Sequence, residues 1–264
     1  MKAMILAAGE GRRMHPLTLS TPKPLLKIGE YSLLEHQLRR LQKAGIQEVL
    51  INVAYLSEQI VEHVGDGRRY GLNISFSKEP KPLETGGAIN YALPFFANKN
   101  NVNGNSELNE ERLLREPFLL INADVWCDFD FKILINRSLA DDEDGCLVLV
   151  KNPEHNKRGD FSFSADLSSE LDSSLDLKHS LLTKPHSRFH NKSQLFYTFS
   201  GISLQRASSI KNYTECREIF PLKEYFDDAI VRNTLAGITH EGLWVDVGTP
   251  ERLETIRALQ ENDA

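Results

Sequence analysis

The chain contains little cysteine, and its cysteines stand in no metal-binding or disulfide pattern. Only Cys127, Cys146 and Cys216 occur among its 264 residues, an odd number without a C-x-x-C pair. Zinc sites and disulfide frameworks need closely spaced or paired ligands, and none of the eight histidines completes such a set. We therefore expect three buried free thiols.

The chain also lacks long apolar runs and a basic surplus. No stretch reaches the roughly 18 uninterrupted apolar residues of a membrane-spanning helix, and no long apolar run follows a basic N-terminus. The formal net charge of -6 disfavours non-specific nucleic-acid binding. We expect a cytoplasmic globular protein that binds neither nucleic acid nor membrane and exists as a monomer or a weak homo-oligomer.

Apolar and amphipathic segments alternate along the chain. The length and a hydrophobic content of 41% suffice for a full core, and we expect residues 1–264 to form a single domain. Strands that alternate with helices imply right-handed βαβ units, and hence an α/β fold with a mostly parallel sheet flanked by helices. The patterns predict strands at 4–8, 48–55, 73–77, 117–126, 197–204 and 244–246. They predict helices over 32–44, beginning at a capping box of Ser32 and Glu35, over 57–64, and from about 85 and 250. Two polar stretches, 98–116 and 164–180, interrupt this order, and the first is predicted to be an exposed insertion.

The segment "ILAAGEGRRMHPLT", residues 5–18, places glycines and arginines directly after an apolar run. Glycines at the end of a strand allow a tight turn whose N–H groups approach an anion, and arginine charge matches phosphate oxygens. The pattern G-x-G-x-x-G fails because Met14 stands at the third glycine position, and no Walker motif occurs. Shortly afterwards, prolines on both sides of Lys23 stiffen the backbone that carries this cation. Each feature alone also fits an ordinary turn, but together they predict a phosphate site.

Two aspartates end apolar strands in this sequence. Asp124 closes "LLINAD" and Asp246 closes "LWVD". In open α/β sheets ligands bind at the carboxyl ends of strands, and Mg²⁺ accepts one or two protein carboxylates together with substrate phosphates. Either residue alone also fits a turn or a helix N-cap. Together, the two aspartates predict a Mg²⁺ site, with Mg²⁺ as the cofactor.

The segments G-x-G-x-R-M-x-P-L-T and T-P-K-P-L, with W-V-D-V-G-T-P near the C-terminus, resemble the signature of the sugar-1-phosphate nucleotidyltransferases. This resemblance implies a Rossmann-like fold, transfer of a nucleotidyl group from a nucleoside triphosphate to a sugar 1-phosphate, and a lid region at 155–205 on the sugar side. It assigns catalysis to Arg13 and Lys23, Mg²⁺ binding to Asp124 and Asp246, nucleotide binding to Ala8, Gly9, Gly11, Arg12, Arg13, Lys23, Gly86 and Gly87, and sugar binding to Asn122, Gly159, Asp160, Ser200 and Gly201.

Within that family, "PLETGGAI", "GDF" and "FSGIS" are most similar to the bacterial uridylyltransferases that act on N-acetylmuramate 1-phosphate in cell-wall peptidoglycan recycling, which implies UTP as the nucleotide. The sequence departs from the commoner family pattern at Glu84 and Ala123, where many relatives have glycine, and at Thr183, where many have glutamate. The alternatives are guanylyl, thymidylyl or cytidylyl transfer to a mannose-, glucose- or choline-type phosphate. A non-catalytic sugar-nucleotide sensor is the alternative from another class.

Overall fold

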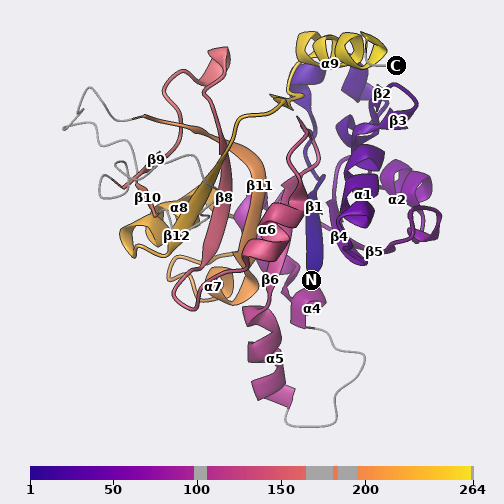
Figure 1. Ribbon diagram of the computed structural model, residues 1–264. Helices are drawn as coiled ribbons and strands as arrows, with labels where there is room; N and C mark the ends of the chain where they lie inside the picture. Colours follow the sequence, from indigo (N-terminus) through magenta and orange to yellow (C-terminus); the bar gives the residue numbers. More distant parts are fainter. Residues whose placement is uncertain (98–105, 165–180, 184–194, 263–264) are drawn as a thin grey trace.

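A seven-stranded sheet forms the centre of the computed structural model, which describes residues 1–97, 106–164, 181–183 and 195–262 (Figure 1). The strands stand in the order β12 (Leu235–His240), β8 (Gly145–Val150), β11 (Thr198–Arg206), β6 (Pro117–Asn122), β1 (Lys2–Leu6), β4 (Glu48–Val53) and β5 (Asn73–Lys78). Within this sheet β11 runs antiparallel to β6 and β8, and all other neighbours are parallel. The predicted α/β fold with a mostly parallel sheet is confirmed.

Helices cover both faces of the sheet because the side chains of its strands alternate between two apolar clusters. In β1, Ala3 and Ile5 belong to one cluster and Met4 belongs to the other. The first cluster includes side chains of α1 (Leu33–Lys43), α2 (Ser57–Val64) and α6 (Phe131–Arg137). The second includes side chains of α3 (Glu84–Tyr91), α4 (Leu93–Ala97), α5 (Ser106–Arg115), α7 (Ala207–Lys211) and α8 (Leu222–Val231).

Helix α1 begins at a capping box, as its sequence predicts. The Glu35 N–H donates to Ser32 Oγ at 3.2 Å, and the Ser32 N–H donates to Glu35 Oε2 at 2.9 Å. Leu34, Leu38 and Leu41 follow on one face of the helix and are fully buried. Burial of such a leucine contributes about 1.5–3 kcal/mol relative to leaving it exposed, so this face anchors α1 on the sheet.

The predicted strand 117–126 is two strands. The Ala123 N–H still donates to the carbonyl of Leu6 in the central sheet, at 3.0 Å, but the carbonyl of Asp124 accepts from Val247, at 2.8 Å. The chain therefore changes its pairing partner at Asp124, and β7 (Val125–Cys127) forms a separate antiparallel ribbon with β13 (Trp244–Asp246).

Two further ribbons and the C-terminal helix complete the described structure. The ribbons pair β2 (Lys27–Ile28) with β3 (Tyr31–Ser32) and β9 (Ser162–Phe163) with β10 (Leu182–Thr183). Helix α9 (Pro250–Asn262) packs through Leu253 and Ile256 in a third apolar cluster that also contains Met14. The C-terminal helix is thus tied to the glycine-rich segment near the N-terminus.

The predicted polar insertion 98–116 contains helix α5, whose Leu114 is buried. Its residues 98–105 lie outside the described residues, as do 165–180 and 184–194 within the predicted lid region 155–205. Among the helices of the described ranges, none has the length and apolar character needed to cross a membrane.

Candidate active site

A cavity of about 470 Å³ lies at the carboxyl ends of β1, β4 and β6. Ligands of open α/β sheets bind at the carboxyl ends of the strands, which is where the sequence analysis predicted the site. The predicted residues that line the cavity are Ala8, Gly9, Gly11, Arg12, Arg13, Lys23, Asn122 and Asp124. The others, Gly86, Gly87, Gly159, Asp160, Ser200, Gly201 and Asp246, lie outside its lining.

The glycine loop between β1 and the short helix η1 (Arg12–Met14) forms one wall of the cavity. Gly11 has a φ of 66°, which favours glycine, and a Cβ there would lie 3.1 Å from Thr18 Cγ2. A Cβ on Gly9, in contrast, would meet nothing within 4 Å. Within the described part of the chain, the N–H groups of both glycines donate to no protein acceptor. They are therefore available to an anion in the cavity.

Lys23 is a buried cation beside the glycine loop, where its Cβ would lie 3.2 Å from a Cβ built on Gly11. It begins the short helix η3 (Lys23–Leu25), follows Pro22 directly, and has a side chain that is only 11% exposed. Its Nζ lies 2.5 Å from Oδ2 of Asp124. The predicted catalytic cation and one predicted metal ligand therefore form an ion pair across 101 residues of sequence.

The two arginines of the loop differ in their surroundings. Arg12 is 79% exposed at its side chain and pairs with Glu10. The guanidinium of Arg13 lies near Gly248, because a Cβ built on Gly248 would be 3.3 Å from Arg13 Nη2 and 2.7 Å from Arg252 Nη2. Gly248 itself lines the cavity. Arg13 and Arg252 thus both approach the loop that follows β13.

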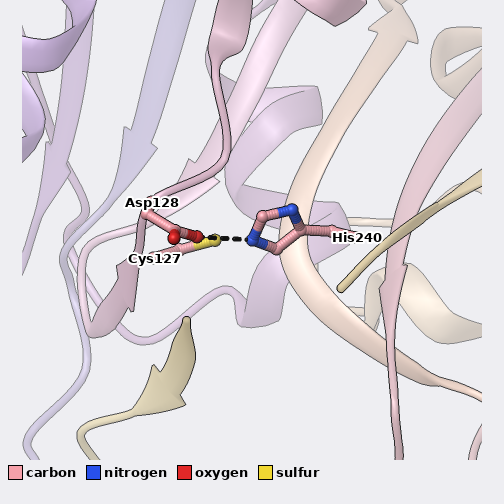
Figure 2. Close-up of side chains that lie close together, drawn as sticks. All are labelled: Cys127, Asp128 and His240. Atoms are coloured by element: carbon pink, nitrogen blue, oxygen red, sulfur yellow. Dashed lines mark hydrogen bonds and ion pairs between the residues drawn. The ribbon is translucent and has the colours of Figure 1, made fainter. Parts of the chain in front are cut away.

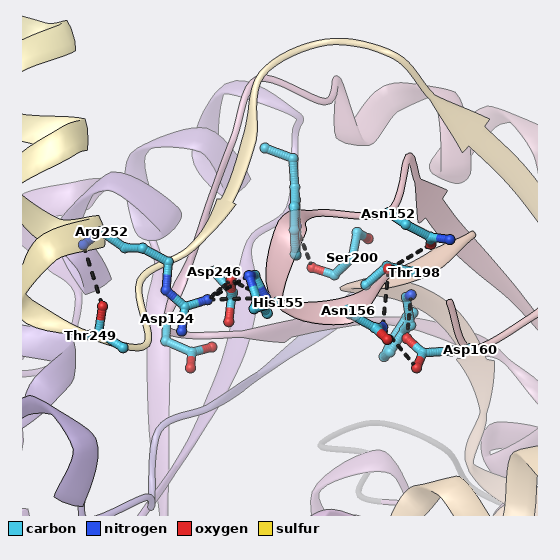
Figure 3. Close-up of polar contacts among 12 residues, drawn as sticks. Asp124, Asn152, His155, Asn156, Asp160, Thr198, Ser200, Asp246, Thr249 and Arg252 are labelled. Atoms are coloured by element: carbon cyan, nitrogen blue, oxygen red, sulfur yellow. Dashed lines mark hydrogen bonds and ion pairs between the residues drawn. The ribbon is translucent and has the colours of Figure 1, made fainter. Parts of the chain in front are cut away.

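The β7–β13 ribbon brings Asp124 and Asp246 to the same edge (Figure 3). Asp246 pairs in register with Val125, the residue after Asp124. Its carboxylate accepts a hydrogen bond from Arg252 in α9, and its Oδ1 lies 3.1 Å from His155 Nε2. Carboxylate oxygens are the hard donors that Mg²⁺ prefers, and protein cations balance both of these carboxylates. The donor atoms are of the type that Mg²⁺ takes, but in this structure Lys23 and Arg252 already bind them, so Mg²⁺ at this pair stays a prediction.

His155 and Arg252 were missed by the sequence reasoning. Arg252 follows Asp246 within "WVDVGTPER", and a cation six residues after a predicted metal ligand is a signal that the pattern contained. His155 lies in the short helix η5 (Glu154–Asn156), far from Asp246 in sequence. No local pattern connects these two residues, so only the tertiary structure brings His155 to the site.

Gly86 and Gly87, predicted to contact the nucleobase, are packed into the interior of the fold. Both N–H groups donate to the carbonyl of Phe220, at 2.9 and 3.1 Å. A Cβ on Gly86 would lie 2.3 Å from the Phe220 ring, and a Cβ on Gly87 would lie 2.3 Å from the Glu218 carbonyl oxygen. These glycines allow α3 to approach the segment 218–220 closely. Their neighbours Glu84 and Thr85 line the cavity instead. Glu84 has a φ of 61°, which glycine adopts more readily.

Asp160 and Ser200, predicted to contact the sugar, use their side chains inside the protein (Figure 3). Asp160 Oδ2 accepts from the Phe199 N–H at 3.0 Å, and its Oδ1 accepts from Asn156 at 3.1 Å. Ser200 is fully buried, and its Oγ accepts from the Ile202 N–H at 3.2 Å. Their sugar contacts stay predictions, whereas their present bonds attach the 152–160 segment to β11 and hold the bend of that strand.

The two glycines of the sugar side both have left-handed backbone conformations. Gly201 has a φ of 80° and lies where the pairing of β11 with β8 shifts register, between Phe199 and Ser203. A Cβ on Gly201 would lie 2.8 Å from Nδ2 of Asn122, which lines the cavity. Gly159 has a φ of 68°. A bulge at Gly201 therefore places β11 directly behind a cavity residue.

Comparisons with known proteins agree with this architecture. The family model described as nucleotidyl transferase matches residues 2–262. The chain belongs to the nucleotidyl transferase family. It is 38% identical over 262 residues to the N-acetylmuramate alpha-1-phosphate uridylyltransferase of Neisseria meningitidis, covering 98% of both chains. It is 31% identical to the mannose-1-phosphate guanylyltransferase catalytic subunit beta of Danio rerio over 95% of this chain, but it spans only 62% of that relative.

Solved structures with lower sequence identity share the fold. A putative glucose-1-phosphate thymidylyltransferase from Bacillus anthracis superposes with a TM-score of 0.75 at 18% identity, covering 98% of this chain and 94% of that chain. HddC from Yersinia pseudotuberculosis complexed with GMP-PN gives a TM-score of 0.69 at 20% identity, with coverage of 98% and 99%. These structures support the fold, and the family match with the 38% identical relative confirms the predicted membership in the sugar-1-phosphate nucleotidyltransferases.

This nucleotidyl transferase also has a polar pair in the cavity wall, buried Asn52 and half-buried Glu79, that sequence reasoning missed. Asn52 Nδ2 donates to Glu79 Oε1 at 2.6 Å, Asn52 Oδ1 accepts from the Ala7 N–H at 2.7 Å, and Glu79 Oε2 accepts from the Leu83 N–H at 3.2 Å. Burial raises the pKa of Glu79, and these hydrogen bonds offset only part of the rise. Both residues stand at strand ends, β4 for Asn52 and β5 for Glu79. The rule that found Asp124 would have found them.

Proposed function

We propose that this nucleotidyl transferase transfers a uridylyl group from UTP to N-acetylmuramate 1-phosphate, giving UDP-N-acetylmuramate and pyrophosphate in cell-wall recycling. The observation that carries the proposal is the 38% identity to the Neisseria meningitidis uridylyltransferase over 98% of both chains. The guanylyltransferase relative supports another specificity less well, since only 62% of its length is matched.

The reaction would proceed by in-line displacement at phosphorus. An oxygen of the sugar phosphate attacks the α-phosphorus of UTP, and the bond from that phosphorus to the α,β-bridging oxygen breaks. Pyrophosphate leaves with the electron pair. The attacking oxygen needs no general base, since the second pKa of a phosphate monoester is about 6. Such transfers depend on positioning and charge stabilisation.

The residues of the cavity supply these two effects. In the proposal, the N–H groups of Gly9 and Gly11 bind phosphate oxygens of UTP, and Arg13 neutralises the departing pyrophosphate. Lys23 lies between the attacking and the α-phosphate, where its buried position holds the ammonium in place. Mg²⁺ on Asp124 and Asp246, when bound, would neutralise negative charge on the phosphates.

Pyrophosphate release tests the proposal directly. The purified protein is incubated with Mg²⁺, one of the common nucleoside triphosphates, and one sugar 1-phosphate from a panel that includes N-acetylmuramate, N-acetylglucosamine, mannose and glucose 1-phosphates. We expect release with UTP and N-acetylmuramate 1-phosphate. Release with GTP and mannose 1-phosphate instead would replace the proposal by guanylyl transfer. Nucleotide binding without release from any pair would favour the sugar-nucleotide sensor.

A further inference from the structure

Three potential metal ligands meet at the end of the β7–β13 ribbon that is opposite Asp124 and Asp246 (Figure 2). The Sγ of Cys127, a carboxylate oxygen of Asp128 and a ring nitrogen of His240 all lie within 4.8 Å of one another. No other group of three such ligands is as compact within the described ranges of the chain. This cluster takes no part in the proposed transfer reaction.

Three separate contacts of the fold hold these ligands together. Cys127 pairs with Trp244 across the ribbon, and the Asp128 N–H donates to the carbonyl of Leu243 at 3.0 Å. The imidazole of His240 packs edge-on against the Phe129 ring, with centroids 5.4 Å apart. Its Nε2 then lies 2.7 Å from Asp128 Oδ1. Backbone pairing and ring packing therefore aim the donor atoms at one point.

A glycine in the loop after β12 makes room for two of these side chains. A Cβ built on Gly242 would lie 2.4 Å from Asp128 Oδ1 and 2.6 Å from His240 Cε1. A Cβ at these distances would clash with both groups. Gly242 therefore allows the loop after β12 to fold around the carboxylate and the imidazole.

We propose that Cys127, Asp128 and His240 bind a thiophilic divalent cation of the Zn²⁺ type, at a site separate from the predicted magnesium site. A thiolate, an imidazole and a carboxylate are the common protein ligands of zinc, and water completes its fourth position. Mg²⁺ prefers oxygen donors and does not fit this set. Tetrahedral coordination separates the donor atoms by roughly 3.4 Å, so His240 and Asp128 need to part by less than about 1 Å.

An ion can reach the cluster from solvent. The Asp128 side chain is 56% exposed, whereas that of His240 is 14% exposed and Cys127 is buried behind them. Burial raises the pKa of the Cys127 thiol to about 11. Zinc binding therefore forms a Zn–S bond and releases the thiol proton to solvent.

A metal here would join β7 to the end of β12. Cys127 is three residues from Asp124, so the ion would stabilise the ribbon that carries both predicted magnesium ligands. Sequence spacing gave no indication of this site, because 112 residues separate Asp128 from His240. Metal binding at this site is independent of the proposed nucleotidyl transfer.

Cobalt binding tests the site with a spectroscopic probe that reports thiolate coordination. The full-length protein is dialysed against chelator and titrated with Co²⁺ in excess Mg²⁺. We expect one equivalent of Co²⁺ to produce a sulfur-to-cobalt charge-transfer band that Zn²⁺ then removes. Zn²⁺ at one hundred times its Kd should raise the melting temperature by about 5 °C or more.

Variants separate this site from other ligands of the chain. Cys127→Ser and His240→Gln should each lose the charge-transfer band, and Asp128→Ala, at an exposed side chain, should weaken Co²⁺ binding at least 10-fold. Cys216→Ser is the matched control and should keep the band. Absence of the band in the wild-type protein, its persistence in His240→Gln, or its loss in Cys216→Ser would overturn the proposal.

Discussion

The two sides of the candidate active site use their residues in opposite ways. On the glycine-loop side, the N–H groups of Gly9 and Gly11 have no protein acceptor within the described residues, and Lys23 lines the cavity. On the sugar side, Asp160 and Ser200 bind backbone N–H groups of β11. The first side presents polar groups to a ligand, whereas the second uses equally polar groups to shape a strand. A motif match alone does not separate these two uses.

The largest expected effect comes from the glycine-loop side. Lys23→Ala should lower turnover by about 10²- to 10³-fold, the scale for loss of one preorganised charge in a catalytic site. Pyrophosphate release at saturating substrates measures the change. Lys27→Ala, an exposed lysine in β2, is the matched control and should keep wild-type turnover. A near-normal rate in Lys23→Ala would remove Lys23 from the mechanism.

The second largest effect is expected in the Mg²⁺ dependence of turnover. Asp246→Asn should raise the Mg²⁺ concentration for half-maximal turnover by about 10- to 100-fold, because the amide is a neutral and weaker ligand. A Mg²⁺ titration of the rate measures this shift, with the exposed Asp66→Asn as control. An unchanged titration curve would show that Asp246 is not a ligand and that its bond to Arg252 is purely structural.

Much of this site was predictable because strand ends are visible in sequence. The positions of Asp124 and Asp246 follow from apolar runs that stop at an aspartate, and both residues lie at the predicted edge. Whether a polar group at such a position faces a ligand or bonds within the protein depends on its neighbours in space, which the local sequence does not show. Nothing near Asp160 in the sequence indicates that the Phe199 N–H would donate to its carboxylate. Likewise, nothing near Gly86 indicates that the carbonyl of Phe220 would accept its N–H.

The fold shows the same division between local and long-range information. The capping box of α1 needs only Ser32 and Glu35, three residues apart, and it was predicted correctly. The break between β6 and β7 depends on β13, more than one hundred residues later, and it was not predicted. Periodicity within a segment therefore located elements, but it did not determine which strands pair.

On the sugar side the expected loss is one of stability. Asp160→Ala should lower the free energy of unfolding by about 1–3 kcal/mol, the cost of leaving the Phe199 N–H without its acceptor. Chemical denaturation measures the loss, and the KM for UTP should stay unchanged. A variant of wild-type stability with a strongly raised KM for the sugar 1-phosphate would instead identify Asp160 as a sugar contact.

The smallest effects separate two glycines within one loop. Gly11→Ala should destabilise the protein by about 1–2 kcal/mol, since alanine is strained at a φ of 66°. Gly9→Ala should leave the stability unchanged, because its Cβ meets nothing within 4 Å, but should raise the KM for UTP by narrowing the phosphate cavity. Equal loss of stability in both variants would contradict a ligand-facing role for Gly9.

Phosphorus NMR of one reaction mixture shows which phosphorus of UTP is attacked. UTP, N-acetylmuramate 1-phosphate and Mg²⁺ are followed with wild-type protein and with Lys23→Ala. We expect signals of a UDP-sugar and of pyrophosphate to grow together at equal rates, and far more slowly in the variant. Formation of UDP and inorganic phosphate, or no reaction while UTP stays bound, would contradict attack at the α-phosphorus.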